Sequence, residues 1–262
     1  MASILRRLFR RKKQPPLVCE VALDDQGNPV GQHPDHQHTA ACFIDLEPLA
    51  VVELFQSQSC QSCPPAIPGI HEGTTHPNII LLTYGVTIFD HTGWKDRFAS
   101  SAWDQRQRAY TRKWNRTSLF TPHVVVNGVS DGSGAGGKTD VQEIVARARA
   151  AQKTTDWNIV IDANDSDVRI DTDKQEAGVY DILFVTYRSN DEVVKVGSGP
   201  NKGKKINHRN VVSRIAKVGE WTGGNLTVSI GDFKAGLKPD EAAVVIVQEG
   251  GAGGPIVAAT KV

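Results

Sequence analysis

The chain has 262 residues, 39% of them hydrophobic, with 30 Lys and Arg against 29 Asp and Glu. This length suffices for one large domain or two smaller ones, and the nearly balanced charge gives no reason to expect nucleic acid as a partner. No apolar run approaches the roughly 18 residues of a membrane helix, and four cysteines in so long a chain do not form the disulfide framework of a small secreted domain.

Residues 1–48 are predicted to form a basic, turn-rich N-terminal extension. Residues 1–13 contain several Arg and Lys, and the first acidic residue is Glu20. Such a start is typical of a mitochondrial presequence, a membrane-surface anchor or a nuclear signal, and equally of a solvated basic tail. We expect a cytoplasmic protein without a transmembrane segment, with mitochondrial import as the alternative.

The extension also holds a group of thiol and imidazole side chains, namely Cys19, His33, His36, His38 and Cys42. Zinc is one candidate ligand for this group, since zinc prefers sulfur and nitrogen donors. A disulfide between the two cysteines, or a second redox pair, is another interpretation. The third is that both thiols are buried and the histidines lie on a loop surface. Apart from zinc, we expect no cofactor.

The most informative feature is the CxxC sequence of Cys60 and Cys63. It follows an apolar, strand-like run at 51–55, and Pro64 and Pro65 come directly after it. Proline is favoured in the first turn of a helix, whose free N–H groups and partial positive charge lower the pKa of a nearby thiol. Cys60 is then the exposed attacking thiolate and Cys63 the resolving thiol, although the same spacing also suits half of a zinc site.

Residues 49–153 alternate between strand and helix patterns. A buried strand is predicted at 79–84, a long polar helix at 94–114, a strand at 124–126 and a helix at 141–148. Asn127-Gly128 is a strong hairpin signal, because both central residues of a type I′ turn need positive φ. This order of elements predicts a thioredoxin-like domain with an enlarged middle.

Thr121 and Pro122 precede the 124–126 strand, which the predicted topology places beside the dithiol strand. Because cis bonds are only about one in twenty of X–Pro bonds in folded proteins, an ordinary trans proline is one interpretation. A cis bond here would instead offer the Thr121 backbone N–H and C=O to an extended peptide or a bound thiol. Thr121 and Pro122 therefore join Cys60 and Cys63 as candidate catalytic residues.

A glycine-rich stretch at 132–139 matches the phosphate-loop pattern of nucleotide-binding proteins. Such a loop needs its strand to run directly into the glycines, whereas Asn127-Gly128 reverses the chain first. A flexible loop before a helix capped by Thr139 or Asp140 is the favoured interpretation.

Residues 154–262 have a different pattern, in which short alternating or apolar runs are separated by turn residues. Examples are 158–161, 179–187, 226–230 and 243–247. No long helical period interrupts them, which predicts an antiparallel β-sandwich-like domain. The predicted fold class is therefore α/β plus β, with a thioredoxin-like domain at 49–153 followed by a β-rich domain at 154–262.

Five blocks of the sequence resemble segments of one protein family. They are the CxxC-Pro-Pro block at 52–65, Gly93-Trp94-Lys95-Asp96, 106–110, Thr121-Pro122 with 125–128, and 208–212. Together they resemble the thioredoxin-like family known as domain of unknown function 1223. The resemblance spans residues 50–230 and implies a thioredoxin-like domain followed by a β region, with Cys60, Cys63 and Pro122 as functional positions.

These patterns predict a thiol–disulfide oxidoreductase or a redox-responsive relative, whose partner is a protein or a low-molecular-weight thiol or disulfide. Glu53, on the strand before the dithiol, is either a buried proton acceptor or a solvent-facing strand residue. One alternative is a metal-binding or metal-delivery protein that uses the dithiol and the His/Cys extension. Another is a non-enzymatic interaction module. The sequence indicates no oligomeric state.

Overall fold

The computed structural model describes residues 47–152 and 157–262, which lie within the compact unit Leu46–Val262. All five residues of the candidate zinc group lie outside the described residues: Cys19, His33, His36, His38 and Cys42. So does the basic start of the chain. None of the described helices is both long and apolar enough to cross a membrane.

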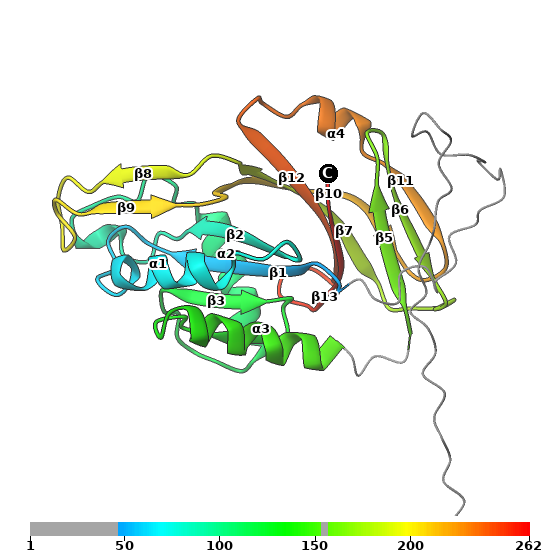
Figure 1. Ribbon diagram of the computed structural model, residues 1–262, viewed down its shortest axis with the longest axis horizontal. Helices are drawn as coiled ribbons and strands as arrows, with labels where there is room; N and C mark the ends of the chain where they lie inside the picture. Colours follow the sequence, from blue (N-terminus) through cyan, green and yellow to red (C-terminus); the bar gives the residue numbers. More distant parts are fainter. Residues whose placement is uncertain (1–46, 153–156) are drawn as a thin grey trace, which may run out of the picture. The chain divides into compact units, whose positions relative to one another are not determined.

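The first sheet has the strand order β2-β1-β3-β4 (Figure 1). β1 (Ala50–Gln56) runs parallel to β2 (Ile79–Gly85) and antiparallel to β3 (His123–Val126), which pairs in turn with β4 (Ser130–Gly132). β1 and β2 are buried along their whole length. This explains why both consist of nearly continuous apolar residues, because strands covered on both faces have no solvent-facing side chains.

Helices cover both faces of this sheet. α1 (Cys63–Gly73) and α3 (Lys138–Gln152) share one hydrophobic core with β1 and β3. α2 (Ser101–Lys113) contributes to a different core, where its aromatic side chains pack with Phe55 of β1. Side chains alternate along β1, so one strand serves both cores.

The helix that the sequence predicts from Trp94 begins instead at Ser101. A short 3₁₀ turn, Asp90–Thr92, and an irregular loop precede it. Asp96 Oδ1 accepts a hydrogen bond from Phe98 N at 2.7 Å, and Ser100 caps α2 by accepting from Ala102 N. Side chains that bond to nearby backbone groups compete with helix formation, which explains why residues 94–100 are not helical and α2 begins only at Ser101.

The Asn127-Gly128 turn has positive φ at both residues, as predicted. Asn127 also makes contacts that the turn signal does not predict. Its Oδ1 accepts from Val51 N at 2.7 Å, its Nδ2 donates to Gln152 Oε1 at 2.9 Å, and its backbone oxygen accepts from Ile256 N at 2.8 Å. One turn residue therefore contacts β1, α3 and β13 (Ile256–Lys261), the last strand of the chain.

Beyond residue 157 the described strands form three antiparallel sheets, with orders β10-β7-β12-β13, β11-β6-β5 and β8-β9. A short helix, α4 (Gly231–Ala235), follows β11. The strands are β5 (Ile159–Ala163), β6 (Asp167–Thr172), β7 (Tyr180–Arg188), β8 (Glu192–Lys195), β9 (Lys205–His208), β10 (Val212–Trp221), β11 (Leu226–Ser229), β12 (Glu241–Glu249) and β13 (Ile256–Lys261).

The four-stranded sheet β10-β7-β12-β13 separates two hydrophobic cores. Phe184 and Val245 face the three-stranded sheet, whereas Val185 and Ile246 pack into the core that contains α2 and β1. The predicted mixture of an α/β part and antiparallel sheets is confirmed. The boundary at residues 153 and 154 remains a prediction, because the described parts on either side share a core within one compact unit.

Candidate dithiol site

The CxxC lies where β1 turns into α1. Ser62 is the N-cap residue of α1, and prolines occupy its first turn. Proline lacks an N–H, but the first N–H groups of a helix have no partner within the helix, so Pro64 and Pro65 cost no helical hydrogen bond. Cys60 N donates to Ser57 O at 3.1 Å, which closes the turn before the helix. The sequence thus places both thiols at the start of a helix.

The two thiols and the Thr121 carbonyl come together. Cys60 and Cys63 are both free thiols, and each has the other as a hydrogen-bond partner. The protonated Cys60 thiol donates to Thr121 O over 3.3 Å. The Thr121–Pro122 peptide bond is cis. Of the predicted site residues within the described chain, Cys60, Cys63 and Thr121 therefore meet at one point, with Pro122 next to Thr121.

The environment gives the two thiols opposite acidities. The hydrogen bond from the Cys63 side chain lowers the pKa of Cys60 to about 6, against the opposing effect of burial, and the backbone N–H groups of Ser62 and Cys63 act in the same direction. Burial raises the pKa of Cys63 well above its usual range. Cys60 is therefore the more acidic of the two thiols and Cys63 its hydrogen-bond donor, an arrangement suited to one attacking and one resolving sulfur.

Cys60 is not exposed, contrary to the expectation from the sequence. Only 3% of its surface and 1% of that of Cys63 is accessible. Apolar side chains from several elements surround the two sulfurs, including Ile67 of α1, Trp94 of the loop before α2, and Val196 and Ile206 from the second part of the chain. The dithiol thus lies beneath a cover that the sequence around the CxxC does not reveal.

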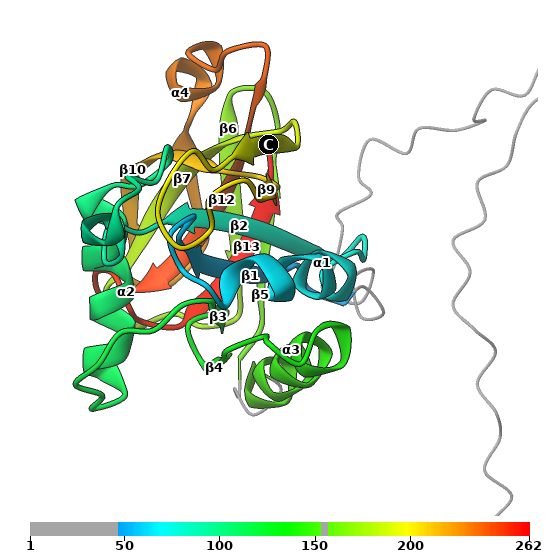
Figure 2. The same ribbon diagram turned by 90° about the vertical axis from the view of Figure 1, so that its left-hand side faces the viewer.

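That cover is formed by β8, β9 and their connecting segment 196–204, here called the covering hairpin. In Figures 1 and 2 it extends across the first sheet toward the start of α1. Asn201 is fully buried and its Nδ2 donates to Gln58 O at 2.9 Å and to Cys60 O at 2.7 Å. The dithiol turn is thereby bonded directly to a residue that lies more than a hundred positions further along the chain.

His208, at the end of β9, contacts the same turn. Its Nδ1 lies 2.6 Å from Gln56 Nε2, and its Nε2 lies 3.3 Å from Gln58 Nε2. Burial lowers the pKa of His208 to about 4, so the ring is neutral at physiological pH. Sequence patterns could have suggested His208 through the block at 208–212, whereas Asn201 lies in a polar turn that carries no signal.

Asp96 holds the turn from the other side. Its Oδ2 accepts from Gln58 N at 2.7 Å. Burial raises the pKa of Asp96 to about 6, and the hydrogen bonds from Gln58 N and Phe98 N oppose this effect. Gln58 Oε1 accepts in turn from Trp94 Nε1 at 2.9 Å. The main chain before Cys60 is thus fixed by buried polar contacts.

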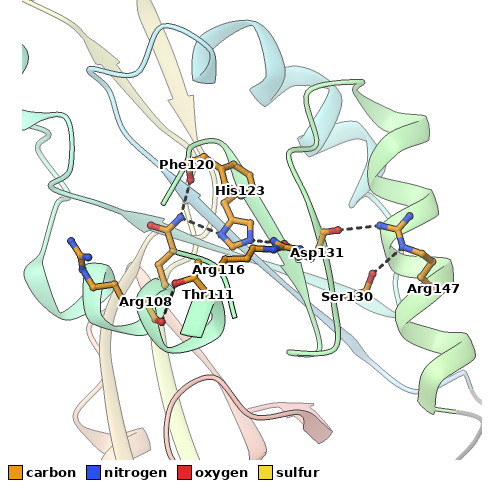
Figure 3. A network of polar contacts seen from close by, with 9 residues as sticks. Arg108, Thr111, Arg116, Phe120, His123, Ser130, Asp131 and Arg147 are labelled. Atoms are coloured by element: carbon orange, nitrogen blue, oxygen red, sulfur yellow. Dashed lines mark hydrogen bonds and ion pairs between the residues drawn. The ribbon is translucent and has the colours of Figure 1, made fainter. Parts of the chain in front are cut away.

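A second polar network supports Thr121 and Pro122. Gln107 Nε2 donates to Phe120 O at 2.8 Å and lies 3.2 Å from His123 Nδ1, so this α2 residue bonds the positions on both sides of Thr121-Pro122. His123 Nε2 lies 3.0 Å from Asp131 Oδ2, and Arg116 pairs with the same carboxylate. Figure 3 shows His123, Asp131 and Arg116 facing one another. Both ring nitrogens of His123 are engaged, which orients the backbone that carries the Thr121 carbonyl.

The interpretation of Glu53 as a solvent-facing strand residue is wrong, whereas its role as a buried proton acceptor stays a prediction. It is fully buried, not solvent-facing. Arg106 Nε donates to Glu53 Oε1 at 2.5 Å, and the Tyr110 hydroxyl donates to Oε2. Arg106 Nη2 also donates to Gln248 Oε1 of β12 at 3.1 Å. Both carboxylate oxygens therefore bind partners on α2, and Glu53 acts as part of an ion pair between β1, α2 and β12.

Among the described residues, the glycine-rich stretch does not have the geometry of a phosphate-binding loop, and no group of metal ligands is found. β4 is antiparallel to β3, and the glycine loop that follows packs on α1, where a Cβ on Gly69 would lie 2.5 Å from Gly137 Cα. Gly136 N donates to Asp140 Oδ2 at 3.2 Å. Within residues 47–152 and 157–262, no three His, Cys, Asp or Glu side chains are grouped as metal ligands.

Alkylation of Cys60 by iodoacetamide is expected to have its midpoint near pH 6, because hydrogen bonding lowers the pKa of this thiol to about 6. Reaction is slow below that pH and reaches a plateau above it, while Cys63 stays unreactive. The measurement is the modified fraction of each cysteine by mass spectrometry as a function of pH. Protein unfolded in urea is the control, with an expected midpoint near about 8.5; a native midpoint near that value would contradict the assignment.

Two solved structures and one family resemble this chain. A crystal structure of a protein from Agrobacterium tumefaciens is 27% identical, with a TM-score of 0.66 over 83% of this chain and 95% of that chain. HBP35 of Porphyromonas gingivalis is similar in fold, with a TM-score of 0.52 at 11% identity over 83% of this chain and 75% of that one. No curated protein matches. Residues 51–248 match the family described as protein of unknown function (DUF1223), and the chain belongs to that family.

Proposed function

We propose that this protein is a thiol–disulfide oxidoreductase, or a redox-responsive relative, that uses the Cys60–Cys63 dithiol. The observation that carries the proposal is the position of the pair, because both thiols lie at the start of α1 and Cys60 Sγ lies 3.3 Å from the Thr121 carbonyl oxygen. The pKa of Cys60 is lowered to about 6 while that of its hydrogen-bonded neighbour Cys63 is raised. These directions agree with the position of the pair, because a helix N-terminus and a neighbouring hydrogen-bond donor both stabilise a thiolate.

The proposed reaction transfers two electrons from the dithiol to a disulfide RS–SR. The Cys60 thiolate attacks one sulfur, the RS–SR bond breaks, and a Cys60–SR mixed disulfide forms as RS⁻ departs. Cys63 then attacks the Cys60 sulfur, which forms the Cys60–Cys63 disulfide and releases the second RS⁻. The Cys63 proton passes to a departing thiolate, since Glu53 is bound to Arg106 and Tyr110. The reverse sequence reduces the protein.

The arrangement of the first sheet supports a thioredoxin-like identity for residues 49–153. Its order is β2-β1-β3-β4, with α1 and α3 sharing one core and α2 contributing to the other. The dithiol at the start of α1 and the Thr121 carbonyl before β3 lie at the same end of this sheet. In the proposed mechanism the carbonyl holds the protonated Cys60 thiol, and the thiolate gains the helix N–H groups instead. The proposal places the protein in the cytoplasm, where other thiols keep the dithiol reduced between cycles.

Redox titration in glutathione mixtures tests the proposal. The expected result is one reversible two-electron transition of the Cys60–Cys63 couple, at a potential between about −270 and −120 mV, the span of known dithiol oxidoreductases. The disulfide is identified by mass spectrometry of the peptide that contains both cysteines. A dithiol with no reversible couple ends the proposal. Tight binding of Zn²⁺ in the absence of a couple would support metal delivery in its place.

A further inference from the structure

The dithiol is closed off by tight packing rather than by loose contact. A Cβ on Gly197 of the covering hairpin would lie 2.8 Å from Trp94 Cζ3, and one on Gly199 would lie 3.2 Å from Thr92 O. Ser198 Oγ donates to Gly93 O at 2.6 Å. With 3% of Cys60 accessible, no flat protein surface could bring a disulfide within bonding distance of its sulfur while this packing persists.

The covering hairpin is also a separate structural unit. β8 and β9 form a two-stranded sheet of their own, and Val193 is 62% exposed. A two-stranded sheet has little stability by itself. The position of the hairpin therefore depends on its contacts with the rest of the chain. Val196 and Ile206 pack with the two cysteines, Asn201 bonds to the dithiol turn, and His208 contacts Gln56 and Gln58 of the segment before it.

Asn201 is the residue of segment 196–204 that bonds to the dithiol turn itself. Both hydrogens of its amide are used on the carbonyl oxygens of Gln58 and Cys60, and its Oδ1 accepts from Lys204 Nζ at 2.9 Å. A buried amide that satisfies two carbonyls fixes a geometry that an apolar residue could not, because the carbonyls would otherwise be left without donors.

We propose that the covering hairpin, held by Asn201, is the specificity-determining element of the dithiol and restricts it to low-molecular-weight disulfides. Disulfides within folded proteins are excluded because they cannot pass the hairpin. This inference rests on the proposed function for its substrate class. The exclusion itself concerns access to a thiol and can be measured without any turnover.

The first measurement compares two thiol reagents on the reduced, full-length protein. Iodoacetamide is small, and a maleimide attached to a polyethylene glycol chain of several kilodaltons is bulky. Modification of Cys60 is followed by mass spectrometry in native protein and in urea. The ratio of the bulky to the small rate is expected to be at least tenfold lower in the native protein. Equal ratios in the two states would overturn the proposal without any variant, and without bearing on the redox couple.

The second measurement uses Asn201→Asp, which keeps the shape but turns an acceptor toward both carbonyls. Each lost hydrogen bond shifts the closed-to-open equilibrium by about threefold to tenfold. Because two bonds are lost, the bulky reagent should react about tenfold to a hundredfold faster, while the iodoacetamide rate changes little. Lys202→Ala, an exposed position on the same segment, is the matched control and should leave both rates unchanged. An N201D protein that folds and shows the native ratio would overturn the role of Asn201.

Disulfide substrates complete the test. The reduced native protein should reduce oxidised glutathione and leave insulin disulfides intact, and N201D should gain activity on insulin selectively. Reduction of insulin by the native protein at a rate comparable with that of oxidised glutathione would overturn the exclusion. If neither disulfide reacts with any variant but the reagent ratio holds, the covering hairpin still controls access and the oxidoreductase function is what fails.

Discussion

Replacing Cys60 with serine is expected to abolish reaction with oxidised glutathione, whereas replacing Cys63 with serine should stop the reaction halfway. Serine is not a nucleophile at neutral pH, and the pKa of Cys63, which burial raises, leaves no second thiolate. In the Cys63→Ser protein, Cys60 still attacks but nothing resolves the product. Mass spectrometry should therefore find one glutathione on Cys60 of Cys63→Ser and none on that peptide of Cys60→Ser.

Ser62→Ala provides the matched control for these variants. Ser62 lies between the two thiols and is exposed, and its side chain makes no capping hydrogen bond to α1. The variant should form and resolve the mixed disulfide as the native protein does. If Cys60→Ser consumed oxidised glutathione at the native rate, the nucleophile would be a different cysteine and the dithiol assignment would be wrong.

Replacing Arg106 with methionine is expected to lower the free energy of unfolding by about 3–5 kcal/mol, the usual cost of removing one partner from a buried ion pair. Arg106 and Glu53 have side-chain exposures of 5% and 0%. Methionine fills a similar volume, but the Glu53 carboxylate then lies buried without its cation. Gln248 also loses a donor to its Oε1. The measurement is urea-induced unfolding followed by circular dichroism.

Two comparisons make this prediction specific. Arg108→Met removes an exposed arginine two residues further along α2 and should change the free energy of unfolding by at most about 0.5 kcal/mol. The double variant Glu53→Gln with Arg106→Met should be more stable than Arg106→Met alone, because no unpaired charge stays buried. An Arg106→Met protein as stable as the native one would show that the ion pair contributes nothing.

The local elements could be read from the sequence, because each depends on residues close together in the chain. The CxxC-Pro-Pro block predicts a helix start, and Asn127-Gly128 predicts a turn of positive φ, and both are found. The predicted start of α2 at Trp94 was wrong by seven residues, because the helix begins at Ser101. Residues with helical propensity continue back to Trp94. The helix does not extend that far because Asp96 accepts hydrogen bonds from the backbone N–H groups of Gln58 and Phe98, which the sequence does not reveal.

The environment of the dithiol could not be predicted in the same way. Burial of Cys60 comes from Val196, Ile206 and Asn201, which lie in another part of the chain and have ordinary strand and turn patterns. The ion pair of Glu53 could not be predicted either, because the sequence around a charged strand residue does not indicate its partner. Arg106 belongs to a polar helix whose other arginines are exposed, and nothing local distinguishes it from them.

The contacts of Asn127 have a consequence for the cooperativity of unfolding. The side chain and backbone of Asn127 form hydrogen bonds with Val51 of β1, Gln152 of α3 and Ile256 of β13. Melting of any one of these segments removes bonds from the others. The two parts of the chain should therefore denature in one concerted transition, and amides in β1 and β13 should show matching protection against hydrogen exchange.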